Sequence, residues 1–200
     1  GALQLVCGPG RGIYDPAGMQ DVCTFTGSAM TGKKLKSLPN IIENSVPFNM
    51  EADSLNAAVL GLDVQPDSPE FDIFIKEVRK EVVTKTGQKC TAIRRIIVPE
   101  NLVEAVKNTL KSELSKITIG DPSIDGVKMG SLVSKGQQDK LIHQIENASK
   151  TIPIAIGNLN HFEVIGSDAK KGAFVAPIIF LNEKPFENLS THQEEFFGPV

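Results

Sequence analysis

Cysteine is scarce in this sequence, and the three that occur, Cys7, Cys23 and Cys90, form no C-x-x-C pair. A disulfide framework normally uses an even set of cysteines, and a zinc site needs closely spaced ligands. The three histidines are also far apart, with no metal-ligand spacing. Neither a disulfide framework nor a metal site is expected, and a reducing, cytoplasmic location is favoured.

Long apolar runs and an excess of one charge are missing as well. No apolar stretch reaches the roughly 18 residues of a membrane span. A net charge of −3 gives no electrostatic reason to expect nucleic acid or an anionic membrane as partner. The start of the chain lacks a basic segment and a cleavage site, so it is not expected to be a signal peptide. The motifs G-x-S-x-G, P-loop and H-E-x-x-H are absent.

Short apolar runs alternate with amphipathic stretches along the whole chain, which is typical of α/β proteins. Helices are expected at Ala29–Leu38, where Pro39 stops the helix, and at Pro69–Lys85, Asn101–Lys116 and Ser134–Ser149. Apolar residues recur every three or four positions in the second helix (Phe71, Ile75, Val78, Val82) and in the third (Leu102, Val106, Leu110, Leu114), and Ser134 is a candidate cap for the last. Strands are expected at Leu3–Cys7, Val22–Phe25, Ser45–Met50, Ala57–Leu60, Ile93–Val98, Ile152–Ile156, Phe162–Ile165 and Phe174–Leu181. The predicted fold is a three-layer α/β sandwich with a mostly parallel sheet and helices on both faces.

A domain boundary is expected near Ser54, because a new β-α-β-α alternation begins there. The chain opens inside the apolar run Leu3–Cys7 and stops without a terminating segment after Glu194–Val200. Both features suggest a segment of a longer protein.

The run Thr24–Ser28 leads from a strand through Gly27-Ser28 into a helix. A helix N-terminus carries free N–H groups and a partial positive charge, so it can receive a phosphate. The simpler interpretation is a turn in which Ser28 caps the helix. The G-x-G-x-x-G fingerprint is absent, so this turn alone is a weak indication of a dinucleotide site.

Cys90 has the most suitable setting for a nucleophile among the three cysteines. It follows Gly87-Gln88-Lys89, between a predicted helix and a predicted strand, and its neighbours are polar and basic. Nearby positive charge favours the reactive thiolate. Cys7 and Cys23 lie inside apolar runs and are expected to be unreactive core residues.

One acidic residue and one acidic segment are further candidates for a functional site. Glu51 ends the apolar run Val46–Met50, at a strand end where α/β folds place ligands. A carboxylate there suits a general base, although a solvated glutamate is the simpler interpretation. In the segment Glu194–Pro199, two acidic residues are followed by two aromatic residues and a Gly-Pro turn. The aromatic rings are expected to pack on a ligand or on a neighbouring domain.

In order and spacing, these pieces resemble the aldehyde dehydrogenase family over essentially the whole chain. Phe25-Thr26-Gly27-Ser28 is similar to the family's cofactor-loop motif, and Gly87-Gln88-Lys89-Cys90 to its Gly-Gln-x-Cys motif. Glu195-x-Phe197-Gly198-Pro199 is similar to the family's Glu-x-Phe-Gly-Pro motif. Met50–Asn56, together with Lys89–Arg95, most resembles the aldehyde dehydrogenase half of the ring-opening enzymes of phenylacetate breakdown. Nothing here corresponds to the hydratase-like domain those relatives often carry.

The resemblance implies NAD(P)-dependent oxidation of an aldehyde, such as a semialdehyde of aromatic-acid breakdown, to a carboxylic acid. Cys90 would be the nucleophile and Glu51 the base that activates water. NAD or NADP would lie against Gly27, Ser28, Glu195 and Phe197. Residues 1–53 would be the last part of a dinucleotide-binding domain, and 54–200 a catalytic domain truncated at its C-terminus. The parent protein would be an enzyme and a homo-oligomer.

Some family features have no matching position. The second oxyanion donor and the adenosine-ribose lysine lie upstream in the family, and the C-terminal oligomerisation strand is absent. The spacing between Glu51 and Cys90 is longer than usual, which fits an insertion around Asp63–Glu70. The isolated chain is therefore expected to have little or no dehydrogenase activity. Alternatives are a CoA-acylating aldehyde dehydrogenase, an acyl-phosphate reductase on the same fold, or a non-catalytic fragment.

Overall fold

The computed structural model describes residues 2–8, 10 and 12–200. The chain divides into two compact units, 1–53 and 54–200. The expected α/β class with mainly parallel strands is confirmed, and among the described residues the strands form three two-stranded sheets.

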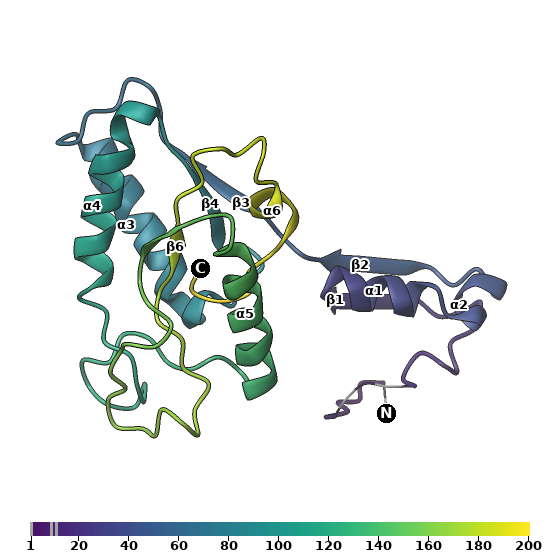
Figure 1. Cartoon of the computed structure of the whole chain (residues 1–200). Coiled ribbons are helices and arrows are strands. Elements are labelled where there is room, and N and C mark those ends of the chain that lie inside the picture. The colour runs from purple at the N-terminus through teal and green to yellow at the C-terminus, as the bar shows by residue number, and fades with distance from the viewer. Residues whose placement is uncertain (1, 9, 11) are drawn as a thin grey trace. The chain divides into compact units, whose positions relative to one another are not determined.

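The first unit contains one parallel pair of strands with helices between them in sequence. β1 (Cys23–Gly27) pairs with β2 (Phe48–Ala52), and α1 (Ala29–Lys36) lies along this pair (Figure 1). Gly32 is buried, and a Cβ there would overlap the Met50 side chain, so glycine permits the close approach of helix and sheet.

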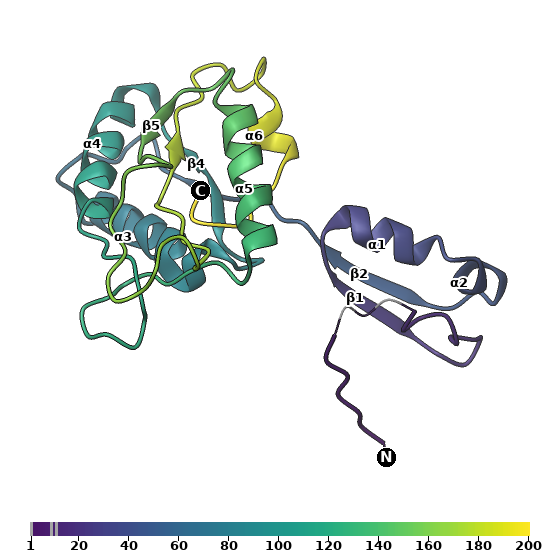
Figure 2. The ribbon, with the colours of Figure 1, turned by 60° about the horizontal axis from the view of Figure 1, so that its bottom comes forward.

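One expectation for this unit is incomplete and one is wrong. The helix that begins at Ala29 ends at Lys36, before Pro39 as expected, but Pro39 also occupies the first turn of a second helix, α2 (Pro39–Glu43), where its missing N–H leaves no hydrogen bond unmade. The run Leu3–Cys7 forms no strand and extends away from the β1–β2 pair (Figure 2), with Leu3 93% exposed and Cys7 exposed. An apolar run becomes a strand only where a neighbouring strand satisfies its backbone, and no described residue does so here.

The second unit begins with β3 (Asn56–Val59), α3 (Pro69–Val83) and the 3₁₀ turn η1 (Thr84–Gly87). β4 (Ile93–Ile97) pairs in parallel with β3, and it is followed by η2 (Glu100–Leu102) and α4 (Val103–Leu114). The remaining elements are α5 (Lys135–Ala148), β5 (Ile154–Ile156), β6 (Ile179–Phe180) and α6 (Ser190–Gln193). β5 and β6 are antiparallel.

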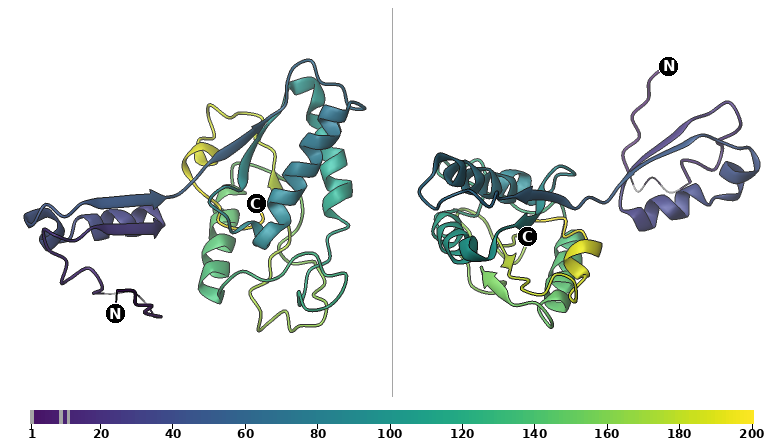
Figure 3. Two further views of the ribbon diagram at one scale, coloured as in Figure 1. Left: turned by 180° about the vertical axis from the view of Figure 1, so that it is seen from behind. Right: turned by 90° about the horizontal axis from the view of Figure 1, so that it is seen from above.

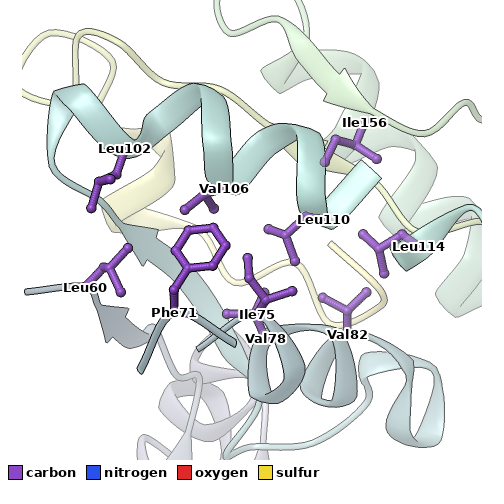
Figure 4. Close-up of a cluster of buried hydrophobic side chains, with 10 residues drawn as sticks. All are labelled: Leu60, Phe71, Ile75, Val78, Val82, Leu102, Val106, Leu110, Leu114 and Ile156. Carbon is purple, nitrogen blue, oxygen red and sulfur yellow. The ribbon is translucent and has the colours of Figure 1, made fainter. Parts of the chain in front are cut away.

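The main core of this unit lies between α3 and α4, which are side by side (Figure 3). Phe71 and Ile75 of α3 point toward Val106 and Leu110 of α4 (Figure 4). Both helices show the expected apolar stripe, buried at each predicted position. Full burial of one such side chain stabilises a fold by about 1.5–3 kcal/mol. The α3–α4 pair is therefore a stable base for the Cys90 loop, which follows α3 and η1 in the chain.

Other expectations for this unit need adjustment. Ser134 caps α5 as predicted, because its hydroxyl accepts from the Gln137 N–H. Phe162–Ile165 contributes only an isolated bridge between Ile165 and Gly120. Phe174–Leu181 is strand only at Ile179–Phe180, while its preceding residues are buried against α5 without ladder bonds.

Candidate functional site

The loop that carries Cys90 connects η1 to β4, and the Cys90 side chain is exposed. The Asn56 side-chain amide of β3 donates to the carbonyl oxygen of Cys90 (2.8 Å) and to that of Ala92 (3.1 Å). The backbone from Cys90 to Ala92 is thus held by a side chain of the neighbouring strand, while Cys90 stays exposed.

Gly87 begins this loop and brings two of the predicted motifs into contact. Its φ is +69°, and a Cβ would overlap the backbone carbonyl of Gly198. Any side chain at Gly87 would therefore be strained and would collide with the Phe197-Gly198-Pro199 segment. Nearby, the buried Thr86 hydroxyl donates to the carbonyl of Gly130 (3.1 Å). The nucleophile and Gly-Pro motifs are one packed arrangement, although more than 100 residues separate them.

Arg94 of β4 joins these two segments and was not predicted as a site residue. Its Nη2 donates to the carbonyl of Gly87 (2.6 Å), and its Nη1 donates to that of Gly198 (2.7 Å). The guanidinium lies 5.6 Å from the ring centroid of Phe197. The available signal was the pair Arg94-Arg95 inside an otherwise apolar strand, because a charge there needs specific partners.

The positive charge expected next to the thiol is largely committed elsewhere. Lys89 Nζ lies 2.8 Å from Glu81 Oε1, and the two side chains are only 22% and 14% exposed. Burial lowers the pKa of the Arg94 guanidinium, and the nearby Glu195 and Glu81 carboxylates oppose that shift. Lys89, a basic neighbour of Cys90 as expected, is therefore not an unpaired charge, because an ion pair inside this unit neutralises it.

The two aromatic residues of the Glu194–Pro199 segment differ in their exposure to solvent. Phe196 is buried in the core beside α5, whereas Phe197 is 38% exposed and rests on Arg94. The Glu195 carboxylate is half-buried, and its Oε1 accepts from the Ser54 hydroxyl (2.9 Å). A carboxylate and an accessible ring are thus held at neighbouring positions of one segment. The role of Ser54 was missed, because nothing local in the sequence connects it to Glu195.

In the first unit, Glu51 and Gly27 lie at the carboxyl ends of paired parallel strands. Glu51 is opposite Thr26, Gly27 is opposite Ala52, and the Glu51 side chain is exposed. The structure therefore brings these two candidates to the same end of one sheet, which is where α/β folds bind ligands.

Ser28 caps α1, since its Oγ accepts from the Thr31 N–H (3.3 Å). The Ala29 N–H at the same helix end donates to Asp53 Oδ1 (3.1 Å), a residue with φ +47° that sequence reasoning did not single out. A carboxylate of the chain itself thus occupies part of the anion-binding end of α1. Its signal was an acid two residues beyond Glu51, directly after the strand that pairs with β1.

A mainly apolar cavity of about 290 Å³ lies in the second unit and is lined chiefly by β4, α4 and β6. Arg94 and Phe196 contribute to its lining, whereas Cys90, Glu195 and Phe197 do not. Among the described residues, no three or more His, Cys, Asp or Glu side chains gather as a metal site. None of the described helices is long and apolar enough to cross a membrane.

Known proteins resemble this chain along its full length. The aldehyde dehydrogenase family profile matches residues 1–200. A 3,4-dehydroadipyl-CoA semialdehyde dehydrogenase of Aromatoleum evansii is 40% identical over the whole chain, which spans 39% of that relative.

Two solved structures share the fold. The NAD⁺ complex of Staphylococcus aureus betaine aldehyde dehydrogenase has a TM-score of 0.77 at 25% identity, over 90% of this chain and 34% of that one. A Bacillus cereus aldehyde dehydrogenase has a TM-score of 0.71 at 27% identity, over the same shares. Since the family profile covers every residue of the chain, the chain belongs to the aldehyde dehydrogenase family.

Proposed function

We propose that the protein containing this chain oxidises an aldehyde to a carboxylic acid with NAD or NADP, using Cys90 as nucleophile and Glu51 as base. The observation that carries the proposal is the Cys90 loop. Its thiol is exposed, and Asn56 fixes its backbone. Cysteine is a strong nucleophile when its thiolate is accessible and held in place.

The residues proposed for the cofactor suit a dinucleotide. Glu195 is oriented by Ser54 and offers carboxylate oxygen to ribose hydroxyls, and Phe197 offers an accessible ring face. Gly27 and Ser28 stand at the N-terminus of α1, which favours phosphate. Asp53 already bonds the Ala29 N–H, so a phosphate at that end would share it with a carboxylate.

The chemistry proposed for this chain has two stages. Cys90 thiolate attacks the aldehyde carbon, forming a C–S bond, and the carbonyl oxygen gains the negative charge of a thiohemiacetal. The bound nicotinamide supplies the hydride acceptor, and the carbonyl re-forms as a thioester on Cys90. Glu51 then takes a proton from water, the resulting hydroxide attacks the thioester carbon, and the C–S bond breaks to release acid and thiolate. Covalent capture divides one difficult oxidation into two easier steps.

We infer a semialdehyde substrate from aromatic-acid catabolism, such as phenylacetate breakdown. The support is the name of the Aromatoleum evansii relative, a semialdehyde dehydrogenase. The reduced thiol that the chemistry requires fits a cytoplasmic protein. Assembly of the parent protein as a homo-oligomer is part of the same proposal.

Thiol labelling with iodoacetamide from pH 5 to 9, read by mass spectrometry, tests the nucleophile in the 200-residue chain. Because Cys7 is exposed, it serves as an internal control for simple accessibility. Cys90 should label at least about tenfold faster than Cys7, as expected for an activated thiol. Equal rates at Cys90 and Cys7 would show that no activated nucleophile is assembled in this chain.

Replacing Glu51 in the full-length parent protein tests the base. Glu51→Gln should preserve a single burst of NAD(P)H and slow steady-state turnover by about 10²–10⁴-fold, the usual contribution of a general base. Undiminished hydrolysis would remove Glu51 from the mechanism. Turnover that depends on added coenzyme A would instead identify an acylating enzyme.

A further inference from the structure

We propose that Arg94 is a positioning residue that holds the Cys90 loop and the Phe197-Gly198-Pro199 segment in one fixed geometry. The inference rests on the proposed function, because only that function assigns the nucleophile of the first segment and the cofactor contact of the second to one reaction. It concerns only contacts inside the second unit.

The first support is the set of acceptors. Arg94 Nη2 donates to the carbonyl oxygens of Gly87 (2.6 Å) and Lys89 (3.2 Å), both just before Cys90. Its Nη1 donates to the carbonyl of Gly198 (2.7 Å), on the other segment. One planar guanidinium therefore spans two segments through three backbone acceptors. A lysine ammonium has no such fork and cannot reproduce this arrangement.

The second support is the environment of the guanidinium. Arg94 Nε is buried and has no hydrogen-bond partner among the described residues. None of the three acceptors is a carboxylate, and the Arg94 side chain forms no ion pair within the described part of the chain. The guanidinium charge is partly buried, and such a charge needs specific hydrogen-bond partners, which here are the carbonyls of the two segments.

The third support is the ring of Phe197. The guanidinium carbon lies 5.6 Å from the ring centroid, within the range of a cation–π contact. The ring is 38% exposed on its remaining surface. Arg94 thus supports from beneath the ring proposed to meet the cofactor, and it also fixes the carbonyls that precede the nucleophile. Displacement of either segment would disturb the other.

The test compares Arg94→Lys with Arg95→Lys in the 200-residue chain. Arg95 is the adjacent arginine of the same strand, and it bonds instead to the Leu55 carbonyl (2.9 Å). Amide hydrogen exchange should rise in residues 87–92 and in residues 196–200 together for Arg94→Lys. Exchange in α4 should stay unchanged, and Arg95→Lys should leave both segments protected. Cys90 iodoacetamide labelling should show an altered pH profile only in Arg94→Lys.

A rescue experiment separates positioning from general stability. In Arg94→Gly, added guanidinium ion well below denaturing concentration should restore protection of both segments, whereas methylammonium should not. Loss of protection in only one segment, or in the whole unit, would overturn the proposal, as would a Lys variant that behaves like the wild type. If wild-type Cys90 labels no faster than Cys7, the proposed nucleophile fails, while the exchange data still decide the role of Arg94.

Discussion

The turn at Gly27-Ser28 and the loop at Gly87–Cys90 are both short connections that carry candidate site residues, yet they are held in different ways. The turn is held partly by its neighbour Ser28, which caps the helix it begins, and partly by Asp53, 24 positions away. The loop is held by more distant residues, by Asn56 at 34 positions and by contacts with Gly198. Local chemistry is sufficient to cap the helix at Ser28, whereas every contact of the Cys90 loop named here forms only when the second unit is folded.

The largest loss of stability is expected from Gly87→Ala, which disrupts the contact between the Cys90 loop and Gly198. The new Cβ would overlap the Gly198 carbonyl at a backbone conformation that L-residues rarely adopt. Overpacking together with strain should cost about 3 kcal/mol of unfolding free energy. Chemical denaturation of the chain measures this loss.

Gly126→Ala is the matched control for that substitution. Gly126 also has a positive φ (+88°), but nothing lies within 4 Å of its ideal Cβ position. Its loss should be limited to strain, about 1 kcal/mol. Equal losses for both variants would show that contact between the loop and Gly198 contributes nothing.

A smaller effect is expected at the local turn from Asp53→Asn. Loss of the negative charge at the N-terminus of α1 should reduce the stability of the first unit by about 0.3–1 kcal/mol. NAD binding, measured by calorimetry, should become tighter if a cofactor phosphate shares that helix end. The control is Asp21→Asn, whose carboxylate bonds the Gly18 N–H in a separate turn. Weaker NAD binding in Asp53→Asn would mean that the carboxylate assists the cofactor instead of competing with it.

The smallest effect concerns Cys23, which is buried at the start of β1. Burial raises the pKa of the Cys23 thiol, with a further contribution from Asp21. The folded state therefore keeps the proton longer than the unfolded chain, so this stabilisation is complete below the thiol's ordinary pKa, about 8.5. It should decline as the pH rises above that value. Cys23→Ala should flatten the alkaline slope in thermal unfolding, and an unchanged slope would contradict the assignment.

Several features could be predicted from the sequence because their causes are local. The stripe from Phe71 to Val82 and the capping of α5 by Ser134 follow from residues within one or two helical turns. The order of the motifs around Gly27, Glu51, Cys90 and Phe197 was sufficient to indicate the family, which the whole-chain match confirms. The roles assigned to those site residues stay predictions.

Other features depended on partners that are distant in sequence. Leu3–Cys7 has the composition of a buried strand but is exposed, because a strand also needs a neighbour to bond. Lys89 was expected to favour a thiolate at Cys90, but its charge is paired with Glu81. The task of Arg94 could not be inferred locally, since its acceptors include Gly198 at the far end of the chain.

The sequence by itself determined the four longest helices, the caps at Ser28 and Ser134 and the family, because periodicity, capping residues and motif order can be read along the chain. Only the tertiary structure decided which charges are neutralised, which cysteine is buried and what holds the Cys90 loop. Those outcomes depend on burial and on contacts across as many as 104 positions, where a hydrogen bond or an ion pair forms only after folding has brought its partners together.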